Sequence, residues 1–218
     1  MRHSGCIMEF WHNRWENQQI GWHRHVYNDL MVKHWPKINA PKDGSVLVPL
    51  CGKTLDMLWL AQQGHEVVGL EMVQQAVDAF FAENNLEVKR VEHNDFCEFS
   101  SPPIAILQGN VFDLPDGTKQ CDAWYDRAAM IAINPSLRED YVNLIRNQTK
   151  LGAVGLLITF TYPQEQMEGP PFSLTDGDVV SFYSSGFEVE LLEKISLEDE
   201  KERGLSSITS SVFKITRK

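Results

Sequence analysis

The chain has 218 residues, of which 43% are hydrophobic and 23% are charged, and 30 acidic against 20 basic side chains give a net charge of −10. This length and composition indicate one globular domain and exclude a disordered or fibrous chain. The acidic balance disfavours nucleic acid or an anionic membrane surface as the main partner, and no stretch reaches the about 18 apolar residues of a membrane-spanning helix.

The four cysteines, Cys6, Cys51, Cys97 and Cys121, form no CxxC pair, so the sequence favours neither a zinc knuckle nor a redox dithiol. Residues 1–8 contain no apolar run of signal-peptide length. We therefore expect a cytoplasmic protein, and we expect a monomer because no large exposed apolar face is indicated.

The first 40 residues are rich in tryptophan and histidine. Residues 28–35 are predicted to be helical, with Pro36 ending the helix. The four tryptophans Trp11, Trp15, Trp22 and Trp35 suit either a packed core or a lid that excludes water from a bound ligand. The histidines carry no acid-and-histidine spacing typical of metal sites, so no metal site is expected.

From residue 45 onward, short apolar runs alternate with segments of helical periodicity. The predicted strands are 45–49, 66–71, 104–108, 121–125, 153–161, 187–192 and 208–216, and the predicted helices are 54–63, 73–84, 135–149 and 174–184. Such alternation predicts an α/β doubly wound sheet. Residues 87–101 interrupt it as an inserted irregular or hairpin segment. No helix separates the last two strands, so we expect an antiparallel pair at one edge of the sheet.

The loop after the first strand, residues 49–53, holds a single glycine, Gly52, and lacks the GxGxxG pattern that binds a pyrophosphate. Gly52 would let the backbone approach a smaller nucleoside ligand. The alternative is an ordinary strand-to-helix turn, which is compatible with the same residues. Glu71 ends the second strand 19 residues after Gly52, the spacing at which a carboxylate binds ribose hydroxyls. A solvated charge at a strand end is the alternative.

Two further strand ends carry candidate site residues. After the third strand, Asn110 and Val111 could contact an adenine ring, or could simply form a turn. After the fourth strand, Arg127 offers a fixed fork of donors suited to an anionic substrate, unless it only pairs with Asp126.

Five stretches make the chain resemble the bacterial branch of the thiopurine S-methyltransferase family. They are FWHNRWENQQIGWH (10–23), VLVPLCGKTLDMLWLAQQGHEVVGLE (46–71), GNVFDLP (109–115), WYDRAAMIAINPSLREDY (124–141) and GPPF (169–172). The PLCGK loop together with the DRAAMIAINP segment is the most specific part of the resemblance.

The resemblance implies a Rossmann-like, seven-stranded class I methyltransferase sheet. It would be mostly parallel, with an antiparallel C-terminal strand and helices on both faces. It also implies residues 1–40 as a segment covering the cofactor, 41–218 as the methyltransferase domain, and S-adenosylmethionine as the cofactor, which has no phosphate. The residues that it implies on the cofactor side are Trp11, Trp15, Leu50, Glu71, Asn110, Val111 and Arg127, to which the loop analysis adds Gly52.

On the substrate side, the resemblance implies Arg127 at the junction of cofactor and substrate, Trp22 in place of a common phenylalanine, and Arg203 as a second arginine. The implied reaction is in-line methyl transfer to the thiolate of a small aromatic or heterocyclic thiol, with selenium or tellurium compounds as further acceptors. Because the leaving group is a neutral thioether, correct positioning can supply most of the catalysis.

Two other interpretations share this sequence pattern. A nicotinamide-dependent Rossmann oxidoreductase would use the same strand order and Glu71, but the absence of GxGxxG disfavours it. A catalytically inactive nucleoside-binding scaffold is the second, and the presence of Leu50, Glu71 and Arg127 disfavours it.

Overall fold

The computed structural model describes the backbone of residues 3–197 and 204–218, and the side chains of 9–197 and 204–218. The helices, in chain order, are α1 (His3–Glu16), α2 (Asp29–Ile38), α3 (Asp56–Gln62), α4 (Gln74–Glu83), α5 (Arg138–Asn147) and α6 (Asp176–Phe182), with 3₁₀ turns η1 (Val111–Asp113), η2 (Pro135–Leu137) and η3 (Gln164–Gln166). The strands are β1 (Ser45–Pro49), β2 (Glu66–Glu71), β3 (Lys89–Glu92), β4 (Cys97–Ser101), β5 (Ile104–Gln108), β6 (Cys121–Arg127), β7 (Thr149–Ile158), β8 (Phe187–Ser196) and β9 (Thr209–Arg217).

These strands form one mixed sheet in the order β3-β4-β5-β2-β1-β6-β7-β9-β8. The five central strands, β5, β2, β1, β6 and β7, run parallel. Antiparallel strands close both edges, with β4 and β3 on one side and β9 and β8 on the other. The expected antiparallel pair at the C-terminal edge is therefore confirmed.

The prediction of seven strands is wrong, because the described part of the chain contains nine. The two additional strands, β3 and β4, form a hairpin from the segment that interrupted the sequence pattern. All four residues of β3 are exposed, so this strand shows no alternation of buried and exposed side chains from which it could be predicted. Its pairing with β4 extends the sheet beyond β5.

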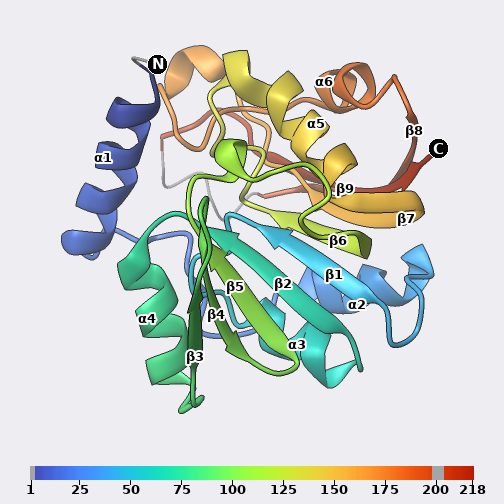
Figure 1. Ribbon diagram of the computed structural model, residues 1–218. Coiled ribbons are helices and arrows are strands. Elements are labelled where there is room, and N and C mark those ends of the chain that lie inside the picture. The colour runs from blue at the N-terminus through green and yellow to red at the C-terminus, as the bar shows by residue number, and fades with distance from the viewer. Residues whose placement is uncertain (1–2, 198–203) are drawn as a thin grey trace.

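Both faces of the sheet are covered by helices, as predicted (Figure 1). Neighbouring residues of β1 show why, since Leu47 belongs to one apolar core while Val46 and Val48 belong to the other. Successive side chains of a strand point to opposite faces, so a strand buried on both faces needs helices on both. Helices α5 and α6 supply residues to the core that contains Leu47, and α2, α3 and α4 supply the opposite one.

Several boundaries differ from the sequence prediction. Helix α1 was not predicted, and α2 continues past Pro36 to Ile38. Pro36 lies in the last turn of α2 and has no amide hydrogen to donate. Only the carbonyl of Val32 therefore lacks its helical donor, and water can hydrate this carbonyl because Val32 is exposed. Strand β7 runs from Thr149 to Ile158 instead of over the predicted 153–161, and Gly152 lies within it at a register irregularity between β6 and β7.

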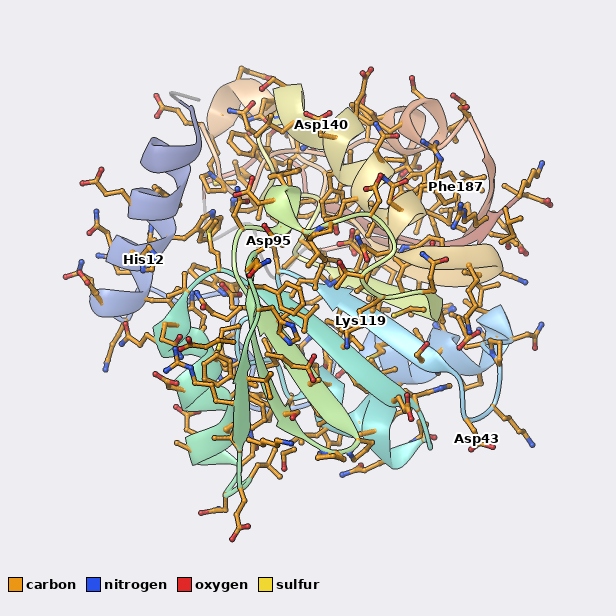
Figure 2. The ribbon with its side chains drawn as sticks, viewed as in Figure 1. His12, Asp43, Asp95, Lys119, Asp140 and Phe187 are labelled. Atoms are coloured by element: carbon orange, nitrogen blue, oxygen red, sulfur yellow. The ribbon has the colours of Figure 1, made fainter. Side chains whose placement is uncertain are left out.

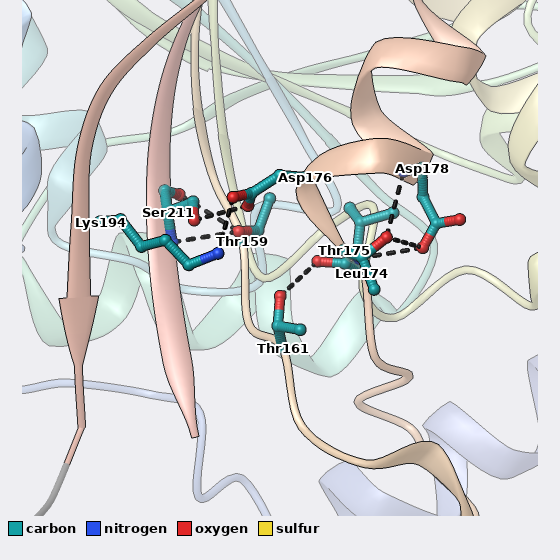
Figure 3. Close-up of polar contacts among 8 residues, drawn as sticks. All are labelled: Thr159, Thr161, Leu174, Thr175, Asp176, Asp178, Lys194 and Ser211. Carbon is teal, nitrogen blue, oxygen red and sulfur yellow. Dashed lines mark hydrogen bonds and ion pairs between the residues drawn. The ribbon is translucent and has the colours of Figure 1, made fainter. Parts of the chain in front are cut away.

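A polar network fastens α6 to the C-terminal edge of the sheet, and we call it the α6 corner (Figure 3). Asp176 accepts hydrogen bonds from the Ser211 hydroxyl and the Lys194 ammonium, both at 2.7 Å. Thr175 and Asp178 form a capping box at the start of the helix. These partners come from β8, β9 and α6, so the corner joins elements that are distant in sequence.

Candidate functional site

The predicted site residues converge at the carboxyl ends of the parallel strands. From β1, the chain proceeds to β2 and β5 on one side, then returns to add β6 and β7 on the other. Strand order therefore reverses between β1 and β6, and ligands of open α/β sheets bind at such a point. Glu71 ends β2, and Arg127 ends β6.

The loop from β1 to α3 has an unusual backbone. Leu50 and Gly52 both have positive φ angles, 47° and 52°, in the left-handed region that side chains with a Cβ rarely adopt. Such strain in a residue other than glycine is concentrated at functional sites. Trp15 packs over this loop, since a Cβ added at Gly52 would lie 3.2 Å from Cζ2 of Trp15.

Glu71 is a buried carboxylate held by this loop. Its Oε2 accepts the Gly52 N–H and its Oε1 accepts the Val73 N–H, each at 2.8 Å. Burial raises the pKa of Glu71, and hydrogen bonds from the backbone of Val73, Gly52 and Met72 oppose that rise. A carboxylate offers about four acceptor sites, so Glu71 retains capacity for hydroxyl donors.

A small apolar hollow lies beside Glu71, with a cavity volume of about 10 Å³, the room of one water molecule, within about 180 Å³ of empty space that includes open solvent. Its lining residues are Leu70, Phe96, Leu107, Gly109, Asn110, Val111 and Leu114. The predicted pair Asn110 and Val111 is thus brought to the same place. The Asn110 side chain also caps η1 by accepting the Phe112 N–H, and its amide donates to Asp113.

Three tryptophans gather over the start of α4. The ring centroids of Trp11 and Trp22 are 5.3 Å apart and those of Trp15 and Trp22 are 6.2 Å apart, both edge to face. They pack with Val73 and Ala76 in one apolar cluster. Helix α1 lies beside α4 at one side of the molecule (Figure 1). These three tryptophans pack together above the strand ends, whereas the fourth, Trp35, belongs to the apolar core on one face of the sheet.

Arg127 is tied to the same N-terminal segment. Its Nη1 donates to the Trp22 carbonyl oxygen at 2.9 Å. The neighbouring Asp126 is buried and pairs elsewhere, because it accepts from the Tyr141 hydroxyl at 2.7 Å and from the Met130 N–H. The sequence alternative in which Asp126 and Arg127 simply pair is therefore not what the structure shows.

Arg203, implied as a second substrate-side arginine, lies outside the described residues. His23, one of the histidines for which no metal site is expected, follows Trp22 and is half-buried. Burial lowers the pKa of His23, and the nearby positive charges of Lys53 and Arg127 lower it further. Within residues 3–197 and 204–218, no group of three or more His, Cys, Asp or Glu side chains could hold a metal ion.

Comparison with known proteins identifies the family. The family model described as "Thiopurine S-methyltransferase (TPMT)" matches residues 7–218. The chain belongs to this family. Among named thiopurine S-methyltransferases, that of Shewanella baltica (strain OS155 / ATCC BAA-1091) is 42% identical over 184 residues, covering 84% of each chain. That of Pseudomonas paraeruginosa (strain DSM 24068 / PA7) is 40% identical over 214 residues, covering 96% of this chain and 98% of the other.

Solved structures with low sequence identity to this family member share its fold. The Burkholderia thailandensis 1,6-didemethyltoxoflavin-N1-methyltransferase, solved with S-adenosylhomocysteine, gives a TM-score of 0.68 at 14% identity, covering 99% of this chain and 88% of the other. A SAM-dependent methyltransferase from Methanosarcina mazei gives 0.66 at 15% identity, covering 88% and 99%. The family match and the named relatives at about 40% identity are methyltransferases, so they do not support the oxidoreductase alternative.

The described residues fit S-adenosylmethionine, the cofactor that the family indicates. The buried Glu71 carboxylate has acceptor capacity left for ribose hydroxyls, and the adjoining hollow is apolar enough for a base. Aromatic rings, such as those above the loop, attract cations, and the sulfonium of this cofactor is a cation. The loop after β1 carries none of the closely spaced glycines that a pyrophosphate requires.

Proposed function

We propose that this chain is an S-adenosylmethionine-dependent thiopurine S-methyltransferase that methylates the sulfur of small aromatic or heterocyclic thiols. The match of residues 7–218 to the family carries this proposal. The convergence of Glu71, the tryptophan cluster and Arg127 at the switch point of the sheet supports it.

On the cofactor side, Glu71 binds the ribose hydroxyls, and Gly52 and Leu50 shape the loop that lets the backbone approach the nucleoside. Asn110 and Val111 contact the adenine in the hollow beside Glu71. Trp11 and Trp15 cover the bound molecule. We therefore assign residues 1–40 as the cofactor-covering segment and 41–218 as the methyltransferase domain, supported by the packing of Trp15 against Gly52.

When bound, the cofactor supplies an electrophilic methyl group on a positively charged sulfur. Arg127 attracts an anionic thiolate to that position, since its guanidinium has five N–H donors and Trp22 receives one of them. Trp22 forms an aromatic wall beside the substrate, and Arg203 is a further substrate-side arginine. By excluding water, the tryptophans strengthen the electrostatic attraction between the reacting groups.

Further properties belong to the same proposal. The strand order β5-β2-β1-β6-β7-β9-β8 supports a Rossmann-like class I methyltransferase sheet with a hairpin added at one edge. Cys51, Cys97 and Cys121 are buried free thiols, which supports a cytoplasmic location. The net charge of −10 supports a small-molecule substrate rather than nucleic acid, and we propose a monomer. No helix of the described residues is long and apolar enough to span a membrane.

The test combines binding with turnover. Calorimetric titration should show binding of S-adenosylmethionine and none of NAD. Incubation with a panel of aromatic thiols, alkyl thiols and selenium or tellurium oxyanions should give methylated products, fastest with the aromatic thiols. NAD binding would favour the oxidoreductase, and cofactor binding without methylation of any acceptor would favour the inactive scaffold.

Arg127→Ala sharpens the assignment of the catalytic side. We expect the methylation rate to fall at least tenfold while the melting temperature changes by a few degrees at most, because one charged donor is lost from a half-buried position. Arg127→Lys should recover part of the rate. Wild-type turnover in Arg127→Ala would remove this residue from the catalytic machinery.

A further inference from the structure

The β3–β4 hairpin brings a turn to the edge of the proposed cofactor site. This turn closes with a 2.9 Å hydrogen bond from the His93 N–H to the Phe96 carbonyl. It lies against the start of the loop after β5, because a Cβ added at Gly109 would be 3.2 Å from the Asp95 carbonyl oxygen and 3.5 Å from Phe96 Cβ. Figure 2 shows Asp95 at this turn, at the opposite end of the sheet from Asp43, which precedes β1.

Phe96 separates two hollows. It lines the apolar hollow that also contains Leu70, Asn110 and Val111. It also lines a second, wider hollow of about 600 Å³, solvent-open space included, whose other residues are mostly polar and include Arg90, Glu92 and His93. Phe96 and Gly109 alone are common to the two sets of lining residues. Phe96 therefore lies between the apolar hollow and the polar one and contributes to the lining of both.

His93 supports the Phe96 side chain by ring stacking. The rings of His93 and Phe96 are stacked, with centroids 4.5 Å apart and planes inclined by 23°. His93 lines the polar hollow and not the apolar one. A stack of this kind restricts rotation of the Phe96 ring while leaving its apolar surface toward Leu70 and Val111.

We propose that Phe96 is a cofactor-binding residue that packs against the adenine base, with His93 as a positioning residue that holds its ring. This inference rests on the proposed function, since it assigns the base to the hollow beside Glu71. An aromatic side chain offers a base a flat, polarisable surface, which an aliphatic wall of equal area does not. The hairpin added to the sheet thus contributes directly to cofactor recognition.

The experiment measures equilibrium binding of two probes, S-adenosylhomocysteine and adenosine, by calorimetry. Phe96→Ala should weaken both probes by the same factor, about tenfold or more, the scale found when one base-stacking aromatic is removed. Equal loss for both probes is expected because they share the base, whereas adenosine lacks the amino acid portion. Phe96→Leu keeps the apolar bulk without the ring and should lie between the wild type and Phe96→Ala.

The positioning role of His93 is tested by removing its ring and then replacing it with another aromatic ring. His93→Ala should weaken both probes severalfold, and His93→Phe, which preserves a stacked ring, should restore wild-type affinity. Phe112→Ala is the matched control, since Phe112 follows Val111, is 38% exposed and lies outside both hollows. Melting curves without ligand show whether each variant is folded.

The outcomes separate this inference from the function on which it rests. Failure of the wild type to bind S-adenosylhomocysteine would overturn both. Wild-type binding together with unchanged affinity in Phe96→Ala and Phe96→Leu would overturn the role of Phe96 alone. Loss of affinity for S-adenosylhomocysteine but not for adenosine would also overturn it, because the contact would then not be with the base.

Discussion

Two polar regions of this molecule, one partly exposed and one buried, are built in opposite ways. At the α6 corner, Asp176 is paired with the Ser211 hydroxyl and the Lys194 ammonium, and a capping box satisfies the start of the helix (Figure 3). At the carboxyl ends of β1 and β2, Glu71 is buried and its carboxylate accepts hydrogen bonds from the backbone N–H groups of Gly52 and Val73, beside residues with left-handed backbone angles.

The difference indicates what each region is for. A polar group paired to complementary side chains, as Asp176 is, stabilises one arrangement of the fold. Glu71 is a buried carboxylate without a charged partner, and burial raises its pKa. Such a group destabilises the ligand-free protein and is typical of a site where a ligand binds to it. Variants in the two regions should therefore separate ligand binding from stability, and the following four tests are ordered by the size of the expected effect.

Replacing Glu71 should produce the largest change. In Glu71→Ala, we expect the affinity for S-adenosylhomocysteine to fall about a hundredfold or more, because hydrogen bonds to a charged group contribute about 1.5–3 kcal/mol each. Glu71→Gln retains one acceptor oxygen and should lose less. Titration calorimetry measures both, with Asp176→Ala as the control. A comparable loss in Asp176→Ala would erase the distinction between the two regions.

Asp126 tests how burial affects a carboxylate that has partners. Burial raises its pKa from 3.8 to about 6, although hydrogen bonds from Tyr141 and Met130 oppose the rise. The native state then binds a proton more readily than the unfolded state, so the contribution of Asp126 to stability should fall as pH rises from about 4 to about 6. Relative to Asp126→Asn, the wild type should lose up to about 3 kcal/mol over this range.

Denaturant unfolding of both proteins at several pH values measures this loss. Asp122 provides a control of opposite sign. Its partial burial raises the pKa, but hydrogen bonds from Lys150 and Ser45 outweigh burial, and the net pKa is lowered. The wild type should therefore gain stability relative to Asp122→Asn as pH rises through the acidic range. A pH-independent difference for Asp126→Asn would contradict the effect of burial.

Gly52→Ala, compared with a matched control, separates the effect of backbone strain on stability from the effect of contact with Trp15 on ligand binding. The positive φ should cost about 1–2 kcal/mol of stability for any residue with a Cβ, and the new methyl group would press on Trp15. Gly152→Ala is the matched control, because Gly152 has a φ of 80° and no atom within 4 Å of the added Cβ. Thermal unfolding should show similar losses for both, whereas only Gly52→Ala should weaken S-adenosylhomocysteine binding. Equal binding in both variants would argue against a lid role for Trp15.

The smallest effects should come from the α6 corner. Asp176→Ala leaves the buried Ser211 hydroxyl without its acceptor and should lower stability by about 1–2 kcal/mol. Lys194→Ala should change stability by less than about 0.5 kcal/mol, because the Lys194 ammonium forms an ion pair with Asp176 that is partly exposed to solvent. Chemical denaturation measures both. A larger loss for Lys194→Ala than for Asp176→Ala would reverse this assignment.

Much of the central sheet could be predicted from local sequence. Strands β1, β2 and β5 have the predicted bounds, because each is a short apolar run buried on both faces and bounded by turn residues. The antiparallel pair of β8 and β9 at one edge of the sheet is also confirmed. Family resemblance indicated Glu71 and Arg127, and their placement at neighbouring strand ends follows from the parallel sheet.

The errors in the strand prediction at β3 and β6 share one physical cause. Strand β6 extends two residues beyond its prediction, to Arg127, because β7 is present to pair with Asp126 and Arg127. Strand β3 is a strand only through its pairing with β4. Neither feature leaves a local hydrophobic pattern in the sequence, since the hydrogen-bonding partner lies elsewhere in the chain.

By itself, the sequence determined the alternation of strands and helices, the family, and the charged residues at the strand ends, since each depends on side-chain type and spacing along the chain. Only the tertiary structure decided that the sheet has nine strands, that Arg127 donates to the carbonyl of Trp22, and that Phe96 walls the hollow beside Glu71. These features join residues far apart in sequence, and their contacts arise only when packing and strand pairing bring those residues together.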